Sequence, residues 1–174
     1  MGRGNSGPNI VLVGFMGAGK STVGAVLAEV LGYRLVDLDQ HIVQRCGKTI
    51  PEIFSTEGEA LFRDYESAAL ASLGTMSRTV LATGGGVVGR QLNWSAMRCL
   101  GPVVYLRLPW ETIRQRIAGD QGRPLADQSD GGERLHRLWV ERAPLYEQAD
   151  VIIDCDSQTP GEIARKIIQA LEKE

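Results

Sequence analysis

Several residue types that mark particular classes of protein are scarce in this chain of 174 residues. Its three cysteines, Cys46, Cys99 and Cys155, are widely spaced and form no CxxC pair. This argues against a disulfide framework or a zinc site and favours the reducing cytoplasm. Two histidines are too few to build a metal cluster. The net charge of −2 gives no sign of a protein that binds nucleic acid or a membrane surface.

Long apolar runs are also missing. The run "IVLVGFM", at residues 10–16, is too short to cross a bilayer and breaks at once into Gly, Lys and Ser, so neither a secretory peptide nor a membrane span is expected. The opening "MGRGNS" fits the loose myristoylation pattern, but residues 1–8 are expected to form only a short disordered tail. With 43% hydrophobic residues, the rest suits one domain, expected to act as a monomer.

Strand-like apolar runs alternate with helix-like segments along the chain, which predicts an α/β fold around a parallel sheet. Five strands are expected, at residues 9–14, 33–37, 79–83, 102–108 and 150–154. Helices are expected at residues 19–31, 38–47, 51–73, 89–99, 110–118, 132–148 and 160–173. The segment 119–133, rich in Gly, Asp and Gln, fits neither pattern; a loop of this length is either disordered or a functional lid.

The stretch "GFMGAGKST", from Gly14 to Thr22, matches the phosphate-binding pattern GxxxxGK[ST] between a predicted strand and a predicted helix. Its glycines allow successive N–H groups to turn inward around phosphate oxygens, at the positive end of the helix dipole. Lys20 is expected to reach the β- and γ-phosphates, and the Ser21 hydroxyl to ligate magnesium. The predicted ATP-binding residues of this loop are Gly17, Ala18, Gly19, Lys20, Ser21 and Thr22.

An acid is missing where many nucleotide-hydrolysing folds carry one. The third predicted strand ends in Thr83 and the triplet Gly84–Gly86. In "LVDLDQH" the second strand supplies acids instead, since Asp37 can face the magnesium water shell while Asp39 reaches the acceptor. The alternative for Asp39 is a helix N-cap, and the alternative for Asp37 is a solvated strand end.

The next segment, "IPEIFSTEGEALFRDYE", carries a family resemblance. The run Gly58-Glu59, Phe62-Arg63 and Glu66, after the phosphate loop and the D-x-D pair and before "GGG", resembles the shikimate kinase family. The resemblance extends over almost the whole chain. It implies a P-loop NTPase fold like that of the nucleoside monophosphate kinases, with a mobile lid. It also implies transfer of the ATP γ-phosphate to the 3-hydroxyl of shikimate, with Mg²⁺, in the route to chorismate and the aromatic amino acids.

The resemblance also implies a set of acceptor residues. Asp39, Arg63 and the backbone of Gly84, Gly85 and Gly86 would hold shikimate, with Asp39 orienting and deprotonating its hydroxyl. A second arginine, Arg142 in "ERAPLYEQAD", would share the substrate carboxylate, and Phe54 and Phe62 would wall the ring. Forked guanidinium donors match a carboxylate. The alternatives are a surface ion pair for Arg63, a solvated charge for Arg142 and ordinary core for the two phenylalanines.

Three further residues follow from the resemblance. Arg123, in the lid motif "GRPLA", would fold over the transferring phosphate and stabilise its charge together with Lys20; Ala126 stands where a leucine is common. Arg116 would stack on adenine, although it could instead be a cation at a helix C-terminus. Gln158, in "DSQTP", falls in the expected adenine loop.

Two rival functions stay open. Gluconate kinase would share the fold and an acidic acceptor, but the glycine triplet and the Arg63–Glu66 context speak against it. A sensing module that binds nucleotide or shikimate without turnover would not need Lys20, Ser21, Asp39 and Arg123 together.

Overall fold

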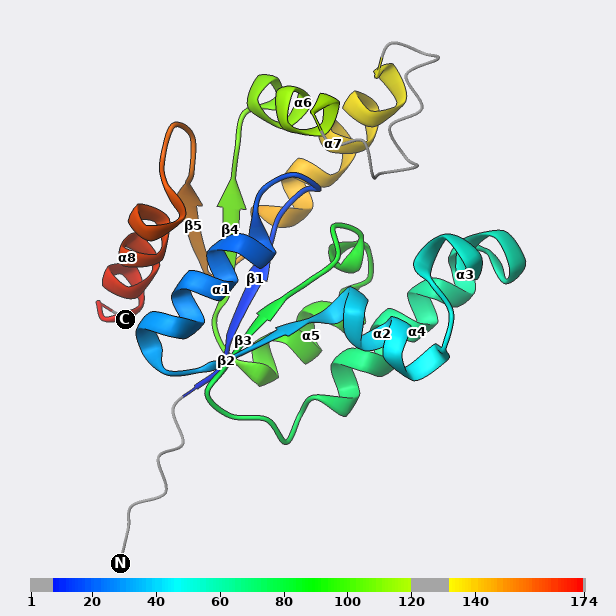
Figure 1. The fold of residues 1–174 in the computed structure, drawn as a ribbon, viewed down its shortest axis with the longest axis horizontal. Helices are drawn as coiled ribbons and strands as arrows, with labels where there is room; N and C mark the ends of the chain where they lie inside the picture. The colour runs from blue at the N-terminus through cyan, green and yellow to red at the C-terminus, as the bar shows by residue number, and fades with distance from the viewer. Residues whose placement is uncertain (1–7, 120–131, 174) are drawn as a thin grey trace, which may run out of the picture.

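The computed structural model describes residues 8–119 and 132–173 and contains a five-stranded sheet in the order β2-β3-β1-β4-β5 (Figure 1). All four strand pairs are parallel. The strands are β1 (Ile10–Val13), β2 (Arg34–Asp37), β3 (Thr79–Ala82), β4 (Val103–Arg107) and β5 (Val151–Asp154). Each lies inside one of the five predicted strand ranges, so the α/β prediction is confirmed.

Burial of the strands follows their place in the sheet. Every residue of the inner strands β1 and β3 is buried, as expected where helices cover both faces. The edge strands are more exposed: β5 alternates between buried and exposed residues, and β2 has no buried residue. The burial of a strand therefore depends on its place in the sheet, since β5 alternates although Val151, Ile152 and Ile153 are all apolar.

Helices occupy the predicted intervals. They are α1 (Lys20–Leu31), α2 (Leu38–Cys46), α3 (Ile50–Thr56), α4 (Gly58–Ser72), α5 (Gln91–Leu100), α6 (Trp110–Ala118), α7 (Glu133–Tyr146) and α8 (Pro160–Leu171), with a short 3-10 turn η1 (Val87–Gly89) before α5. In Figure 1, α1 and α8 lie together on one face of the sheet, while α4 and α5 lie on the other. None of the helices in the described ranges combines the length and the apolar content that a bilayer crossing requires.

The expectation of one continuous helix over 51–73 is wrong. The chain breaks at Glu57, and Gly58 adopts a φ of 86°, in the left-handed region that favours glycine. The first piece, α3, starts with a capping box in which the Thr49 side chain accepts from the N–H of Glu52 and the Glu52 carboxylate accepts from the N–H of Thr49. Helices α2 and α3 pack against α4 on the β2 side of the molecule (Figure 1).

The strand order brings two loops together. From β1 the chain crosses to the β2 side of the sheet, whereas from β3 it crosses back over β1 to β4. The loops that follow β1 and β3 therefore start side by side at the carboxyl edge of the sheet and lead away in opposite directions. Open α/β sheets bind ligands at such a point. The glycine-rich loop at residues 14–19 and the glycine triplet at residues 84–86 are these two loops.

Candidate functional site

The loop between β1 and α1 is built mainly from backbone. Gly17 and Gly19 have φ angles of 77° and 85°, which other residues rarely adopt. Gly19 is the N-cap of α1, and no side chain caps this helix end. The first N–H groups of α1 are therefore placed to receive phosphate oxygens, with the positive end of the helix dipole behind them.

The other residues predicted for this loop lie beside it. Ala18 is buried and its N–H donates to the Phe15 carbonyl at 3.1 Å. Ser21 and Thr22 are exposed on the first turn of α1. The Lys20 ammonium donates to the carbonyls of Gly14 and Phe15, at 2.8 and 3.0 Å, and so lies across the loop. The six predicted residues thus share one location.

Asp37 links this loop to the next element. Its Oδ2 accepts from the Ser21 hydroxyl at 2.7 Å, and its Oδ1 accepts from the N–H groups of Asp39 and Gln40, at 3.1 and 3.2 Å. Asp37 is therefore the N-cap of α2. The alternative interpretations of both acids are wrong: Asp39 is not the cap, and Asp37 is not merely a solvated strand end. The two residues predicted to serve a metal, Ser21 and Asp37, lie within hydrogen-bond distance of each other.

The glycine triplet is packed against charged side chains. A Cβ atom on Gly84 would lie 2.8 Å from Oδ1 of Asp39 and 3.0 Å from Oε1 of Glu66. A Cβ atom on Gly86 would lie 2.2 Å from Nη1 of Arg63, so the guanidinium would have to move to admit a side chain there. The family resemblance implies one reason for these glycines, a backbone that holds the substrate directly. The structure adds a second reason, because the site's own side chains occupy the space that a Cβ would need.

Arg63 and Glu66 form a pair inside the protein. Nη1 of Arg63 donates to Oε2 of Glu66 at 2.6 Å, and Nη2 donates to Glu59 at 2.9 Å. The side chain of Glu66 is 0% exposed and that of Arg63 is 17% exposed, so a surface ion pair is ruled out. Burial raises the pKa of Glu66, although the Arg63 guanidinium opposes that shift. Within the described residues, Oε1 of Glu66 has no hydrogen-bond partner.

Glu66 belongs to the run that resembles the shikimate kinase family, but no role of its own was predicted for it from the sequence. Its spacing of three after Arg63 on a helix was a usable signal, since residues three apart share a helix face. The spacing alone does not distinguish an exposed pair from a buried one. The close approach of Glu66 to Gly84, and its complete burial, place it in the same cluster as Asp39 and Arg63.

The two predicted ring-wall residues are adjacent. The Phe54 and Phe62 rings are 4.8 Å apart between centroids and tilted by 37°. Phe62 is buried in the core, and the Arg63 guanidinium lies 5.3 Å from its ring centroid. Phe54 is partly buried and packs against the same core. The alternative interpretation as core therefore holds for Phe62, which also borders the Arg63 guanidinium.

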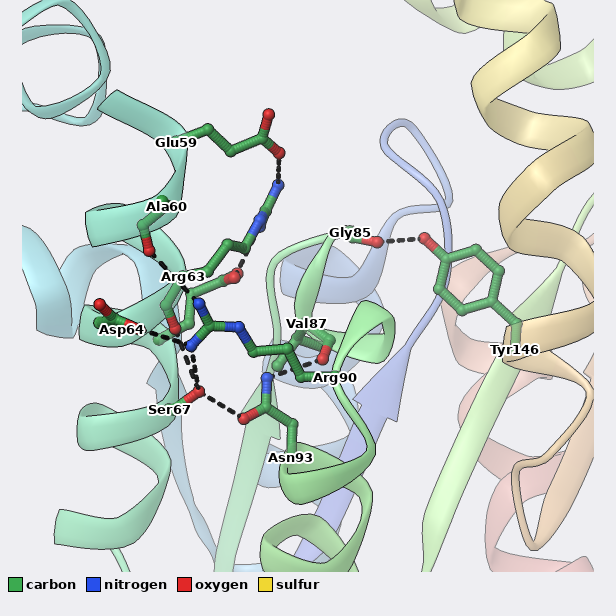
Figure 2. A network of polar contacts seen from close by, with 11 residues as sticks. Glu59, Ala60, Arg63, Asp64, Ser67, Gly85, Val87, Arg90, Asn93 and Tyr146 are labelled. Carbon is green, nitrogen blue, oxygen red and sulfur yellow. Dashed lines mark hydrogen bonds and ion pairs between the residues drawn. The ribbon is translucent and has the colours of Figure 1, made fainter. Parts of the chain in front are cut away.

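Helix α7 approaches the glycine triplet from the opposite side. The Tyr146 hydroxyl donates to the Gly85 carbonyl, as Figure 2 shows, and its ring stacks on Tyr105 at 5.1 Å between centroids. Burial raises the pKa of Tyr146, so the hydroxyl keeps the proton that it donates. Nη1 of Arg142 is 3.7 Å from the position of a Cβ on Gly85. The second predicted arginine thus reaches the same turn as Arg63.

The predicted adenine-side residues lie apart from this cluster. Arg116 is exposed in the last turn of α6, and its Nη1 donates to the Gly17 carbonyl at 3.1 Å. It is therefore both a cation at a helix C-terminus and a neighbour of the phosphate loop. Nε2 of Gln158 donates to the Asp154 carbonyl within its own loop, at 2.8 Å. Arg123 and most of the predicted lid at 119–133 lie outside the described residues.

In chemical terms the site has two halves. One is a backbone cradle for phosphates with Lys20 across it and the Ser21–Asp37 pair beside it. The other combines one half-buried acid, Asp39, with two arginines around a bare turn. Across residues 8–119 and 132–173, no three His, Cys, Asp or Glu side chains are grouped to hold a metal. A metal here would need ligands from hydroxyl groups, water and a bound phosphate.

Comparison with known proteins agrees with this arrangement. The family described as "Shikimate kinase" matches residues 16–172. A shikimate kinase of Nostoc sp. is 43% identical over 166 residues, which cover 95% of this chain and 91% of the relative. The structure of an Acinetobacter baumannii shikimate kinase in complex with shikimate is 41% identical, with a TM-score of 0.90, and the match covers 96% of this chain and 94% of the other.

A sugar-acid kinase shares the architecture at lower identity. The structure of a gluconokinase from Sinorhizobium meliloti has a TM-score of 0.65 and 23% identity, over 95% of this chain and 92% of that chain. Identity at this level shows the fold alone.

Proposed function

This chain belongs to the shikimate kinase family, whose members move the γ-phosphate of ATP to the 3-hydroxyl of shikimate in the route to aromatic amino acids, and we propose how its two half-sites carry out that reaction. The observation that carries the proposal is the convergence on residues 84–86. An acid from α2, an arginine from α4 and an arginine from α7 all approach one turn that has no side chains of its own.

The nucleotide half holds ATP by its phosphates. The N–H groups of Gly17, Ala18 and Gly19, with those at the start of α1, surround the phosphate oxygens, and Thr22 lies on the first turn beside them. Lys20, now bonded to two loop carbonyls, turns to the β- and γ-phosphates when ATP arrives. Arg116, which already touches the loop, borders the nucleotide, and Gln158 lies on the adenine side.

The donor set beside this loop fits Mg²⁺. The Ser21 hydroxyl and the Asp37 carboxylate, 2.7 Å apart, are hard oxygen groups, and Mg²⁺ takes few protein ligands because it keeps several waters and binds phosphates. We assign Ser21 as a direct ligand and Asp37 as a partner of the metal's water shell. Bound there, Mg²⁺ would neutralise charge on the β- and γ-phosphates.

The acceptor half holds shikimate. Arg63 and Arg142, on opposite sides of the turn, share its carboxylate, and the backbone of Gly84, Gly85 and Gly86 faces its hydroxyl groups. Phe54 and Phe62 border the ring. Asp39, beside Gly84, orients the 3-hydroxyl and takes its proton as the phosphoryl group arrives. Arg123 is assigned to the migrating phosphoryl group on the family resemblance alone.

The setting of the reaction is part of the proposal. We assign the enzyme to the cytoplasm as a monomer. The three cysteines are unpaired, as a reducing compartment would keep them.

The test is a coupled assay of ADP release with shikimate, gluconate, nucleoside monophosphates or no acceptor. We expect fast ADP release with shikimate and not with the other acceptors. Chelation of Mg²⁺ should abolish this release, and adding Mg²⁺ back should restore it. Comparable release with gluconate would favour the sugar-acid kinase that shares the fold. Saturable binding of shikimate and ATP without ADP release would favour a sensing module.

A further inference from the structure

The turn that carries the glycine triplet is joined to helix α4 by a buried side chain that has no substrate contact in the proposed function. We infer that Asn93, on α5, is a positioning residue of the acceptor half, which holds this turn at a fixed distance from the helix that carries Arg63. The inference rests on the proposed function, because it concerns the same acceptor site.

Both polar atoms of Asn93 are committed inside the protein. The residue is 1% exposed, its Nδ2 donates to the Val87 carbonyl at 2.8 Å, and its Oδ1 accepts from the Ser67 hydroxyl at 2.8 Å. A carbonyl only accepts, so the contact with Val87 fixes which way the amide faces. The oxygen must then face Ser67, and the hydroxyl must donate. The amide thus connects the residue after Gly86 with α4.

Ser67, which Asn93 contacts on α4, lies one helical turn after Arg63. The Ser67 hydroxyl also lies 3.0 Å from the carbonyl of Arg63, as the network in Figure 2 shows. Arg90 adds a second connection, donating to Asp64 at 2.7 Å and to the Ala60 carbonyl at 3.4 Å. The Arg90 and Asp64 side chains are 37% and 61% exposed, so this pair contributes little. The buried amide is the stronger connection, since losing it would strand buried polar groups.

The spacing that this bridge sets is critical for Arg63. A Cβ on Gly86 would lie 2.2 Å from Nη1 of Arg63, so the guanidinium rests directly on the turn. If α4 and the turn moved apart, the Arg63 guanidinium would lose its contact with Gly86. Gly84 would also move away from Asp39 and Glu66. The phosphate loop is attached to β1 and α1 and has no part in the bridge. Substitution of Asn93 is therefore expected to weaken binding of the acceptor and not binding of the nucleotide.

The chain offers a matched control for this residue. Asn9 is also buried, at 6% exposure, and its amide also joins separate segments, here through backbone groups: Nδ2 donates to the carbonyls of Met76 and Leu100, at 2.8 and 3.1 Å, and Oδ1 accepts from the N–H of Thr79 at 3.1 Å. It precedes β1, at the amino edge of the sheet, opposite the site. Substituting Asn9 therefore also removes a buried, hydrogen-bonded amide, but at the edge of the sheet opposite the acceptor half.

The experiment measures KM for shikimate, KM for ATP and kcat for Asn93→Leu and Asn9→Leu beside the wild-type chain. For Asn93→Leu, KM for shikimate should rise on the order of tenfold, while KM for ATP stays within about twofold. For Asn9→Leu, thermal stability should fall while both KM values stay at the wild-type level. A purely structural role for Asn93 would lower the active fraction, and hence kcat, and leave both KM values unchanged; that result overturns the inference.

A milder variant keeps the test decisive if Asn93→Leu does not fold. Ser67→Ala removes only the hydroxyl that meets Asn93, and it should raise KM for shikimate by about threefold with KM for ATP unchanged. Equal rises in both KM values, or none, would overturn the inference. Failure of the proposed function is distinguishable, because the wild-type chain would then release no ADP with shikimate.

Discussion

The two halves of the site are encoded in different ways. The central part of the nucleotide half, the phosphate loop, is a contiguous stretch, residues 14–22, in which we assign most of the binding to backbone groups and a helix terminus. The acceptor half draws on α2, α3, α4, the turn after β3 and α7, from residue 39 to residue 142. Its specificity depends on side chains that meet only after the chain has folded.

This difference predicts different sensitivities. A backbone cradle depends on local conformation, so its failures should affect every acceptor alike. A site of converging side chains depends on packing beyond the site, as the bridge through Asn93 illustrates, so its failures should be selective for shikimate. Substitutions in each half test whether the two are as separable as the geometry suggests.

The largest effect is expected in the nucleotide half, at Lys20. Because Lys20→Ala removes a cation that we assign to the β- and γ-phosphates, kcat should fall on the order of 10³-fold with any acceptor. The measurement is ADP release at saturating shikimate and ATP, together with the slow release without acceptor. Both rates should fall in the same proportion. A loss confined to the reaction with shikimate would contradict the division into two halves.

The next effect is expected at Asp39. Asp37 caps α2, so Asp39→Asn leaves the cap intact and replaces the carboxylate by an amide of the same size, which has no charge and cannot take up the proton. Turnover should fall on the order of a hundredfold, the low end for a general base, because phosphoryl transfer needs the base less than most reactions. Thermal stability should stay within about 1 kcal/mol of the parent. Turnover within about threefold of the parent would remove Asp39 from the catalytic residues.

The contrast between the halves also explains what the sequence could predict. Gly14 to Thr22 form a phosphate loop in one stretch, and the alternation of apolar runs located all five strands. The break at Gly58 was missed because the helical pattern continues across it, and only the backbone angle reveals it. The identity of the α2 cap was missed because Asp37 and Asp39 are equally good caps by type.

The burial of individual side chains could not be predicted from the local sequence pattern. Arg63 and Glu66 have the spacing of any surface ion pair, and their enclosure depends on the turn after β3 lying against α4. Asn93 has no sequence signal at all, since its partners are 26 residues before it in α4 and six before it at Val87. Such residues are found only when the chain's distant segments are seen side by side.

Substituting Arg63 and Arg142 one at a time compares two arginine contacts within the acceptor half. Arg63→Ala and Arg142→Ala should each raise KM for shikimate by roughly 10- to 100-fold, the scale of a charged hydrogen bond, with little change in KM for ATP. Arg63→Ala should also lower the unfolding temperature, because it leaves the buried Glu66 without its partner. Arg142→Ala should lower it less, because Glu66 keeps its hydrogen-bonded partner Arg63 in that variant. Equal loss of stability in both variants would contradict the assignment of the buried pair.

A smaller effect should appear in the pH dependence of stability at Glu66. Burial raises its folded-state pKa above the ordinary value of 4.5, so just above pH 4.5 the native state retains a proton that the unfolded chain has lost. The free energy of unfolding should therefore fall as pH rises from 4.5 through the folded-state pKa. Glu66→Gln has no such proton and should lack this component. Denaturant unfolding at several pH values measures it, and parallel curves for the two proteins would contradict the shift.

The smallest effect is expected at Arg116, on the outer side of the nucleotide half. Its guanidinium is exposed and makes one contact with the loop, to the Gly17 carbonyl, so solvent weakens whatever it contributes. Arg116→Ala should raise KM for ATP by about threefold and leave kcat and KM for shikimate near the parent values. Arg114→Ala, two residues earlier on α6 and paired with Glu111, is the matched control and should change neither constant. A change in KM for shikimate at Arg116 would show that the nucleotide half influences the acceptor half, and that the two are not independent.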